Sequence, residues 1–288
     1  MSGTGADADA AVRVVSVTFN PGDELEAFAR SLADATSRPV TLVLVDNGSD
    51  PSVVDDVAAR YGATVLRPGR NLGYGAAANL GAREGEEPWV VVANPDLVWH
   101  AGALDELLAA GARHPRAGSL GPRILNLDGT LYPSARAIPS LTQGAGHAVF
   151  ARFWPGNPWS RAYRRQQEVV EASEHAVGWL SGACLLLRRE ALAPLGGFDE
   201  RYFMFFEDVD LGDRLGRAGW QNLYVPTAAV VHDQGASWRE RPTAMIRAHH
   251  RSAEQYLHGR YAAWWQAPLR WAITLGLRTR AWWETRGR

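Results

Sequence analysis

Two patterns of apolar residues alternate through the first third of the chain. Continuous apolar runs, rich in β-branched residues and each closed by a turn-forming cluster, predict buried strands at residues 12–19, 41–45, 63–66 and 89–93. Apolar residues at helical spacing predict helices at residues 24–35, 52–61 and 76–83. Strands that alternate with helices of about 10 residues indicate βαβ units, so the predicted fold class is α/β with a mostly parallel central sheet flanked by helices.

The pattern becomes looser in the second half of the chain. Residues 129–140 are rich in turn formers, and residues 154–165 are aromatic, basic and interrupted by proline, which favours a mobile loop. Strand-like apolar runs return at residues 178–188 and 223–231, and a helix is predicted between them at residues 210–218. The chain contains no internal repeat.

Polar side chains follow three of the predicted strands at the points where these strands end. They are Thr18 and Asn20, Asp46 and Asn47, and Asn94 and Asp96. Because ligands of parallel α/β sheets bind beyond the carboxyl ends of the strands, these residues predict a binding site along one rim. Asp46 could accept a hydrogen bond from a pyrimidine imide or a ribose hydroxyl there, or it could close an Asx turn.

Asp96 is placed to hold a divalent cation at this rim. A departing diphosphate needs its developing charge neutralised, and a hard cation bound by one or two carboxylates and by phosphate oxygens does this. Asn94 could then contact a sugar or a ribose. The structural alternative is that this segment caps a helix over residues 97–111.

The helix predicted at residues 76–83 is preceded by the segment Arg70-Asn71-Leu72-Gly73-Tyr74-Gly75. Glycines at a helix N-terminus let backbone amides approach a phosphate, and Arg70 adds a permanent positive charge. The segment lacks the third glycine of the dinucleotide fingerprint and follows the third strand instead of the first. It indicates phosphate or base contact, or a structural helix start, and it argues against a nicotinamide-dependent oxidoreductase.

Residues 203–210, with the sequence FMFFEDVD, place aromatic side chains around carboxylates. Aromatic crowding raises the pKa of at least one member of a carboxylate pair, and a positioned carboxylate of raised pKa can deprotonate a hydroxyl. We predict Asp208 as the general base, Glu207 as the reserve, and Asp210 as a cap or an orienting residue. The alternative is that all three acids stabilise the start of the following helix.

Two further residues are candidates because of their positions. His232 follows the strand predicted at residues 223–231 and enters a turn, where its imidazole could complete a metal site with Asp96. Trp179 could stack on an acceptor sugar or belong to the core, and the sequence leaves both possibilities open.

Composition and charge describe an ordinary globular protein with one unusual segment. Hydrophobic residues make up 46% and charged residues 21% of the 288 residues, and the single Cys184 excludes an internal disulfide. All 30 basic residues are arginine, and the net charge is −1. From Arg239 onward, however, 10 arginines against 3 glutamates give a net charge of +7, which leaves −8 on the remainder. A basic segment on an acidic body suggests an anionic surface as a partner.

The basic C-terminal segment is also rich in tryptophan. Residues 244–286 predict two or three helices, one of them starting at Pro268, and an apolar stripe recurs at spacings of seven or four at Trp264, Trp271, Leu275 and Trp282. The segment either packs on the preceding domain or lies on an anionic membrane surface. Residues 1–11 have no basic region before an apolar stretch, so we expect no secretory signal. No apolar run approaches the roughly 18 residues that a spanning helix needs. We expect a cytoplasmic protein, free or peripheral on the inner face of the plasma membrane, with no nucleic-acid partner.

Taken together, these motifs resemble those of family 2 glycosyltransferases of the GT-A fold, and most of all the rhamnosyltransferase branch that acts on lipid-linked sugars. The resemblance runs from Val12 to Ser237 in the order and spacing of the family. The segments that carry it are VSVTFN at 15–20, VDNGS at 45–49, RNLGYGAAANLG at 70–81, NPD at 94–96, GWLSGACLLLRREAL at 178–192, GGFDERYFMFFEDVDLGDRLGRAGW at 196–220 and HDQGAS at 232–237.

The resemblance implies roles for individual residues. The nucleotide-sugar donor would contact Thr18, Asn20, Asp46, Asn47, Arg70, Asn71, Asn79, Asn94 and Asp96. Asp96 would bind Mg²⁺ or Mn²⁺ through the donor diphosphate with His232 as a second ligand, and Asp208 would be the base. The acceptor would contact Trp179, Ser181 and Gly182. The aspartate-any-aspartate triplet of the family reads Asn-Pro-Asp here, which leaves one carboxylate at the metal site and makes His232 and the nucleotide more important for metal affinity.

These roles imply an inverting transferase with three parts. We expect a disordered N-terminus at residues 1–11, a GT-A catalytic domain at 12–238 with a nucleotide-sugar-binding half at 12–115 and an acceptor-binding half at 116–238, and a helical tail at 239–288. The resemblance suggests dTDP-rhamnose as donor and N-acetylglucosaminyl-diphospho-polyprenol or another glycan as acceptor, in cell-wall or polysaccharide synthesis. A UDP-hexose donor and a non-catalytic nucleotide-sugar-binding protein are the alternatives.

Overall fold

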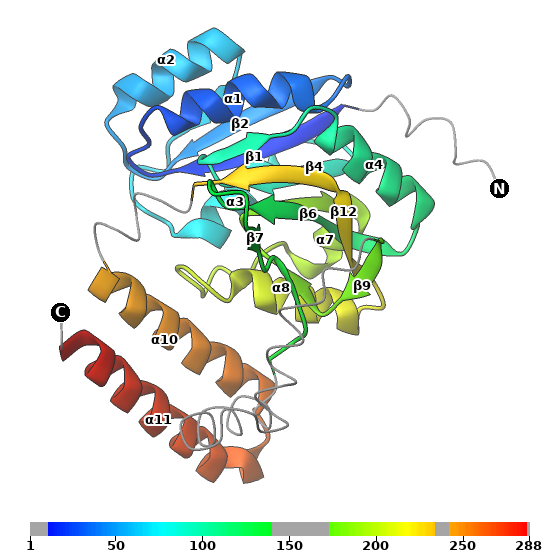
Figure 1. Cartoon of the computed structure of the whole chain (residues 1–288). Coiled ribbons are helices and arrows are strands. Elements are labelled where there is room, and N and C mark those ends of the chain that lie inside the picture. The colour runs from blue at the N-terminus through cyan, green and yellow to red at the C-terminus, as the bar shows by residue number, and fades with distance from the viewer. Residues whose placement is uncertain (1–10, 140–172, 234–241, 287–288) are drawn as a thin grey trace.

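The computed structural model describes residues 11–139, 173–233 and 242–286 of the chain (Figure 1). The expected disordered N-terminus, the loop expected at residues 154–165 and the QGAS portion of the HDQGAS segment lie outside these residues, apart from Ala11 at the edge of the first range. The expectations for those segments stay predictions.

A mixed central sheet forms the middle layer of the protein. Its strands follow the order β3-β2-β1-β4-β11-β6-β12-β5, with β7 paired to β6 and β9 paired to β12. The strands are β1 (Val12–Thr18), β2 (Val40–Asp46), β3 (Thr64–Leu66), β4 (Trp89–Ala93), β5 (Leu97–Trp99), β6 (Ala117–Leu125), β7 (Leu131–Tyr132), β9 (His175–Val177), β11 (Cys184–Arg188) and β12 (Gln221–His232). Strands β1 to β4 are mutually parallel, and β12 runs parallel to β6. A separate two-stranded sheet joins β8 (Ala135–Arg136) to β10 (Trp179–Leu180).

Helices cover both faces of the central sheet (Figure 1). One face packs on α1 (Glu24–Ala35), α2 (Pro51–Tyr61) and α4 (Ala103–Arg113), and the other on α3 (Tyr74–Arg83), α7 (Arg189–Leu192) and α8 (Glu207–Arg217). Strand β1 shows why both faces are covered: Val12 and Val14 enter one apolar cluster, and Val15 and Val17 enter the other. Burying each such side chain stabilises the fold by about 1.5–3 kcal/mol.

The predicted α/β class and the strands of the first third are confirmed. The helix considered for residues 97–111 is wrong, because Leu97–Trp99 form the edge strand β5 and α4 begins only at Ala103. Leu97 and Trp99 are buried whereas Val98 is 40% exposed, which is the period of two expected for a strand. Asp96 therefore precedes a strand and cannot cap that helix. The helix predicted at 210–218 begins three residues earlier, at Glu207, so Asp210 lies in its first turn and pairs with Arg214.

The C-terminal segment forms two helices that lie side by side, α10 (Pro242–Arg260) and α11 (Ala267–Arg286) (Figure 1). Short 3-10 helices occur at Ala193–Leu195 and Trp264–Gln266. Helix α10 packs on the body of the protein, whereas no residue of α11 is buried. Within the described residues, no helix has the length and apolar character required to span a bilayer.

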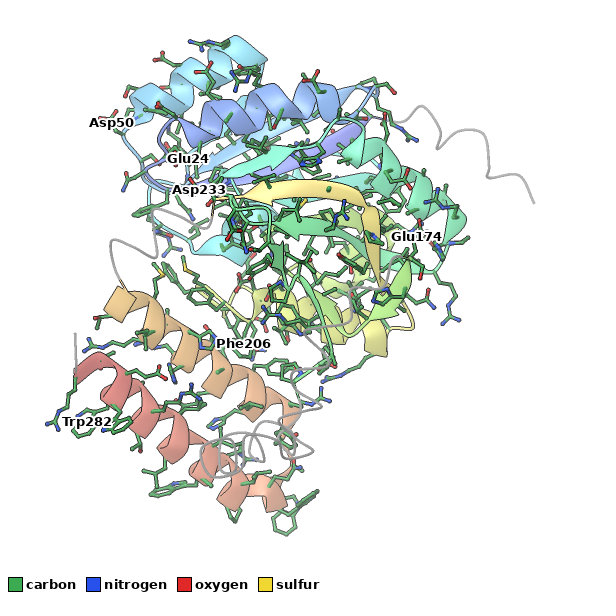
Figure 2. The ribbon with its side chains drawn as sticks, in the orientation of Figure 1. Glu24, Asp50, Glu174, Phe206, Asp233 and Trp282 are labelled. Atoms are coloured by element: carbon green, nitrogen blue, oxygen red, sulfur yellow. The ribbon has the colours of Figure 1, made fainter. Side chains whose placement is uncertain are left out.

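Helix α10 contacts the turn that precedes α8, where Phe206 lies in Figure 2. Phe205 and Phe206 have φ angles of 66° and 68°, a left-handed conformation that is costly for residues other than glycine. The ring of His249 lies 5.6 Å from that of Phe205 and 5.4 Å from that of Phe206, and the buried Ser252 hydroxyl donates to the Met204 carbonyl at 2.7 Å. These contacts from α10 hold the strained turn in place.

Candidate active site

The carboxyl ends of β1, β2, β4 and β12 lie at the same edge of the sheet and position the candidate site. Strand β5 pairs antiparallel with β12, so that Leu97 lies opposite His232. The two flanking residues are consequently adjacent, and the Asp233 amide donates to the Asp96 carbonyl at 3.1 Å. Figure 2 labels Asp233 at this end of β12. This register brings Asp96 and His232 together although 136 residues separate them in the chain.

The His232 imidazole faces two polar side chains. Its Nε2 atom lies 3.0 Å from Asp96 Oδ1 and 3.2 Å from Asn94 Nδ2, and the residue is 8% exposed. One ring nitrogen cannot accept from the Asn94 amide and donate to Asp96 at the same time. A cation shared by Nε2 and Oδ1 would satisfy both atoms through their lone pairs, so the pair fits a metal site. Nδ1 is buried and has no hydrogen-bond partner among the described residues.

These two side chains would be the protein's share of a metal site. Within the described part of the chain, no group of three or more His, Cys, Asp or Glu side chains is arranged to hold a metal ion. The remaining ligands would therefore have to come from a bound diphosphate and water, which is the usual arrangement for Mg²⁺.

Asp208 reaches the same edge through the turn between β10 and β11. The antiparallel pairing of β11 with β4 places Ala183 beside Asn94, whose amide donates to the Ala183 carbonyl at 2.9 Å. One residue earlier, the Gly182 amide donates to Asp208 Oδ2 at 2.9 Å, and the Tyr74 hydroxyl donates to the Gly182 carbonyl at 2.6 Å. Desolvation, followed by the charge of Glu207, raises the pKa of Tyr74, so the phenol stays a donor.

The carboxylates of Glu207 and Asp208 occupy different environments in the first turn of α8. Glu207 is 6% exposed and its Oε2 atom is buried with no partner among the described residues; burial and then the charge of Asp208 raise its pKa to about 8. Burial also raises the pKa of Asp208, against the opposing effects of the Gly182 and Val209 amides and of Arg136. Asp208 is half-buried and therefore the more accessible of the two.

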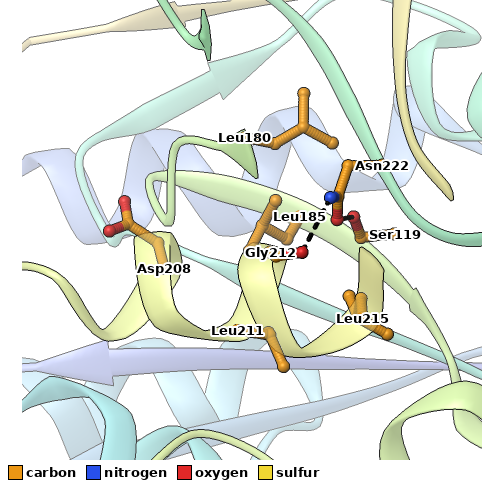
Figure 3. Close-up of a pocket in the computed structure, with 8 residues that line it drawn as sticks. All are labelled: Ser119, Leu180, Leu185, Asp208, Leu211, Gly212, Leu215 and Asn222. Carbon is orange, nitrogen blue, oxygen red and sulfur yellow. Dashed lines mark hydrogen bonds between the residues drawn. The ribbon is translucent and has the colours of Figure 1, made fainter. Parts of the chain in front are cut away.

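The middle of α8 is anchored to the sheet by Asn222 of β12 (Figure 3). The Asn222 amide donates to the Gly212 carbonyl at 3.0 Å and to the Gly178 carbonyl at 2.8 Å, and it accepts from Ser119 at 2.7 Å. The small pocket around these residues and Asp208 has no room for a water molecule. It is a packing defect between α8 and the sheet, too small to hold a substrate.

The residues predicted to contact the acceptor lie around Asp208, in different roles. Trp179 is half-buried, and its indole nitrogen donates to the Ala137 carbonyl at 3.0 Å. The Arg136 guanidinium lies 5.4 Å from the Trp179 ring centre. Ser181 is 8% exposed, and its hydroxyl accepts from the Ala183 amide at 3.3 Å, so it shapes the turn that presents Gly182.

At the ends of β1 and β2, the Asx-turn alternative for Asp46 matches the observed geometry. Its carboxylate accepts from the amides of Gly48 and Ser49, and Arg67 Nε donates to Oδ2 at 3.2 Å. Although burial opposes ionisation, these hydrogen bonds hold the pKa of Asp46 below its usual range. Asn47 binds both the Gly73 carbonyl and the Leu72 amide, so it fastens the glycine-containing segment to this edge.

The other predicted donor contacts are placed in three ways. Thr18 has no exposed surface, and its hydroxyl lies 3.5 Å from the Val45 carbonyl. Asn20, Arg70 and Asn71 are exposed at the rim. Asn79 is buried, and its amide binds the Phe198 backbone and the Glu200 carboxylate, so in this geometry it holds the loop before α8.

Gly73 has a structural reason to be glycine. Its φ angle is 84°, and a Cβ atom there would lie 2.2 Å from the Phe203 carbonyl oxygen. The same carbonyl accepts from the Tyr74 amide at 2.9 Å. The segment at 70–75 is thus packed on the turn before α8, which the phosphate-approach interpretation did not foresee.

Sequence reasoning missed four residues that organise the site, namely Arg67, Tyr74, Arg136 and Asn222. Tyr74 lies inside a segment that the sequence singled out, and its position at the start of a helix was the only signal available. Arg67 directly follows the strand predicted at residues 63–66. It could have been proposed from that position as a partner of Asp46. No sequence signal distinguishes Arg136 or Asn222 from other polar residues.

A comparison with protein families matches residues 10–253 to the model described as glycosyltransferase like family 2. The N-acetylglucosaminyl-diphospho-decaprenol L-rhamnosyltransferase of Mycobacterium tuberculosis is 52% identical over 280 residues, which are 93% of this chain and 91% of that protein. The pre-mycofactocin glycosyltransferase of the same organism is 29% identical over 231 residues, covering 80% of this chain and 44% of that protein.

Solved structures share the fold at low sequence identity. The mannosyltransferase PcManGT from Pyrobaculum calidifontis, in complex with GDP-Man and Mn²⁺, has a TM-score of 0.56 at 17% identity and covers 94% of this chain and 69% of its own. GalNAc-T7 with UDP, GalNAc and Mn²⁺ has a TM-score of 0.58 at 16% identity. The match covers 79% of this chain and 44% of GalNAc-T7. The family match spans β1 to the middle of α10, and the chain therefore belongs to the glycosyltransferase like family 2 and is a glycosyltransferase.

Proposed function

We propose that this glycosyltransferase moves L-rhamnose from dTDP-rhamnose to N-acetylglucosaminyl-diphospho-polyprenol, with inversion at the anomeric carbon. The observation that carries the proposal is the 52% identity to a rhamnosyltransferase named for this acceptor class, which extends over 93% of the chain. The acceptor named there is a lipid diphosphate, which agrees with a basic, tryptophan-rich pair of helices beside the site.

In the proposed mechanism, Asp208 removes the proton from the acceptor hydroxyl as that oxygen attacks the anomeric carbon. Its pKa is raised by burial, which makes the carboxylate a better proton acceptor, and the Gly182 amide fixes its orientation. Asp96 and His232 would hold a divalent cation, Mg²⁺ or Mn²⁺, which neutralises charge on the departing diphosphate when bound. The nucleoside would lie along the rim formed by Asn20, Asp46 and the segment at 70–73.

The proposal predicts a donor preference. With an N-acetylglucosaminyl-diphospho-polyprenol of short chain and Mn²⁺, dTDP-rhamnose should give a rhamnosyl disaccharide, and UDP-hexoses should give little product. Mass spectrometry of the lipid product and release of dTDP measure this. Efficient transfer from a UDP-hexose would instead support the alternative donor class, and donor binding without any transfer would support the non-catalytic alternative.

The assignment of the base predicts a difference between two neighbouring acids. Asp208→Asn should lower kcat by about 10²–10⁴-fold, the usual contribution of general-base assistance. Glu207→Gln should lose much less at pH 7, because a carboxyl group with a pKa of about 8 is already mostly protonated there. Wild-type kcat/KM should fall as the pH drops through the raised pKa of Asp208, since the base must be ionised. The kcat/KM of Asp208→Asn should not show this fall at acidic pH. The reverse order of the two variants would make Glu207 the base.

The metal site predicts that His232 contributes to cation affinity. His232→Ala should weaken Mn²⁺ binding in the presence of dTDP by about 10-fold or more, as loss of a contact in a metal site commonly does. Calorimetric titration with Mn²⁺ measures the affinity directly. His100→Ala is the matched control, because His100 is exposed at the other end of β5. Equal affinities for wild type and His232→Ala would remove His232 from the site.

We also propose that α10 and α11 bring the enzyme to an anionic membrane surface, where its lipid-linked acceptor resides. Residues 242–286 carry seven arginines and two glutamates. The exposed tryptophans are Trp264 (86%), Trp265 (65%), Trp271 (76%), Trp282 (50%) and Trp283 (72%). Exposed aromatic rings next to arginines are the composition of helices that lie at lipid headgroups.

This proposal predicts binding to vesicles that contain anionic lipid. The full chain should co-sediment with phosphatidylglycerol vesicles at low salt, less at high salt, and only weakly with neutral vesicles, because part of the attraction is electrostatic. Replacing Trp271 and Trp283 by alanine should reduce the bound fraction several-fold. Leu127→Ala, at a site 69% exposed outside the tail, should leave it unchanged. Failure of the wild-type protein to sediment at low salt would rule out the membrane surface.

A further inference from the structure

Arg136 lies in the small sheet that contacts α8, the helix of the candidate base, in a position that none of the proposed roles uses. Strands β8 and β10 form the small sheet in which Arg136 lies directly opposite Trp179. The guanidinium carbon is 5.4 Å from the ring centre of Trp179 and 5.9 Å from that of Tyr132. Cation–π attraction to two aromatic rings restrains the guanidinium group and limits the entropy lost when it binds a ligand.

Most of the hydrogen-bonding capacity of Arg136 is unused by the described residues. Its Nε atom donates to the Pro133 carbonyl at 2.7 Å, which leaves the two terminal nitrogens. Among the described residues, no carboxylate forms a salt bridge with it, whereas Arg67, Arg113, Arg201 and Arg214 each pair with an acid. A half-buried arginine that has aromatic neighbours and pairs with no acid among the described residues is suited to a phosphate, whose oxygens match the fork of N–H groups.

The position of Arg136 relative to Asp208 identifies which phosphate it would meet. Trp179, which lies opposite Arg136, packs against Gly212 of α8, and the Gly182 amide that follows β10 binds Asp208 in the first turn of that helix. The positive charge of Arg136 accordingly acts to lower the pKa of Asp208. In an inverting transfer the acceptor oxygen and the leaving diphosphate lie on opposite sides of the anomeric carbon. A cation beside the base therefore lies on the acceptor side, whereas Asp96 and His232 would hold the donor diphosphate.

We propose that Arg136 binds the diphosphate of a lipid-linked sugar acceptor, with Trp179 as the platform that holds its guanidinium group. Because a hydroxyl and the anomeric phosphate of one hexose are separated by the width of a single ring, a cation beside Asp208 can reach that phosphate while Asp208 contacts the hydroxyl. This inference rests on the proposed function. It implies that the Arg136 side chain makes the enzyme prefer a diphosphate acceptor to an uncharged one.

The test compares two acceptors and two variants. The acceptors are N-acetylglucosaminyl-diphospho-polyprenol of short chain and an uncharged alkyl N-acetylglucosaminide. Arg136→Gln removes the charge and the fork, and Arg136→Lys keeps only the charge. Arg116→Gln is the matched control, because Arg116 is exposed and its guanidinium also donates to a backbone carbonyl, that of Gly219.

We expect Arg136→Gln to raise KM for the diphosphate acceptor by about 10- to 100-fold, the usual effect of losing hydrogen bonds to a charged group. Arg136→Lys should have an intermediate effect. The KM for the uncharged acceptor and the KM for dTDP-rhamnose should stay unchanged in both variants. An equal loss with both acceptors would overturn the proposal in favour of a structural role, and a raised KM for the donor would assign the residue to the donor diphosphate.

A binding measurement separates this inference from the proposed function. Calorimetric titration of the diphosphate acceptor into wild type and Arg136→Gln needs no transfer reaction. Weaker binding by the variant together with no rhamnosyl transfer by the wild type would refute the rhamnosyltransferase assignment and leave the Arg136 site standing. Equal binding by both proteins together with normal transfer by the wild type would refute the Arg136 site and leave the rhamnosyltransferase assignment standing.

Discussion

The pairing of β12 with β5 is the constraint on which the candidate site depends. A shift of one residue in this register would turn His232 to the opposite face of the sheet and separate it from Asp96. The register is held by burial of one face of β5, because Leu97 and Trp99 pack into the core while Val98 faces outward. The short edge strand therefore does more than extend the sheet, since it fixes the distance between the two side chains that would hold a cation.

A second constraint positions Asp208, and it comes from three directions. The Gly182 amide binds the carboxylate from the sheet edge, Asn222 holds the Gly212 carbonyl from beneath the helix, and α10 covers the strained turn at Phe205 and Phe206. Two successive left-handed residues cost on the order of 1–3 kcal/mol each, so such a turn persists only where its surroundings enforce it. The strain therefore makes the orientation of Asp208 dependent on α10, a helix outside the sheet domain.

The sequence predicted those parts of the molecule that depend on local patterns. Buried strands such as β1 and β4 are readable because their residues are apolar on both faces, and the rim follows because parallel strands end together. The edge strand β5 was missed because three residues are too few to show a period, and the preceding Asn-Pro-Asp also looks like a helix start. Asn222 was not distinguishable from surface residues, and Asn79 was predicted in another role, since the roles of both arise from the carbonyl groups that distant segments present to them. The positions of the motifs predicted that Asp96, Asp208 and His232 lie at one edge of the sheet. The hydrogen bonds of Asn47 and Asn79 to backbone groups depend on tertiary packing and could not be predicted in this way.

The arrangement of charge agrees with what the proposed lipid-linked acceptor would require of the protein. The body carries the acids that a transferase needs, and a net charge of −8 before Arg239 would repel it from an anionic bilayer. The segment from Arg239 onward holds 10 of the 30 arginines. This segment can therefore be attracted to an anionic surface while the acidic site keeps its charge. Because α10 connects that face to the turn before α8, the surface proposed to meet the membrane and the residue proposed to remove the acceptor proton are separated by a single helix. An enzyme whose acceptor is embedded in a bilayer needs this proximity, since the sugar extends from the lipid by no more than its diphosphate.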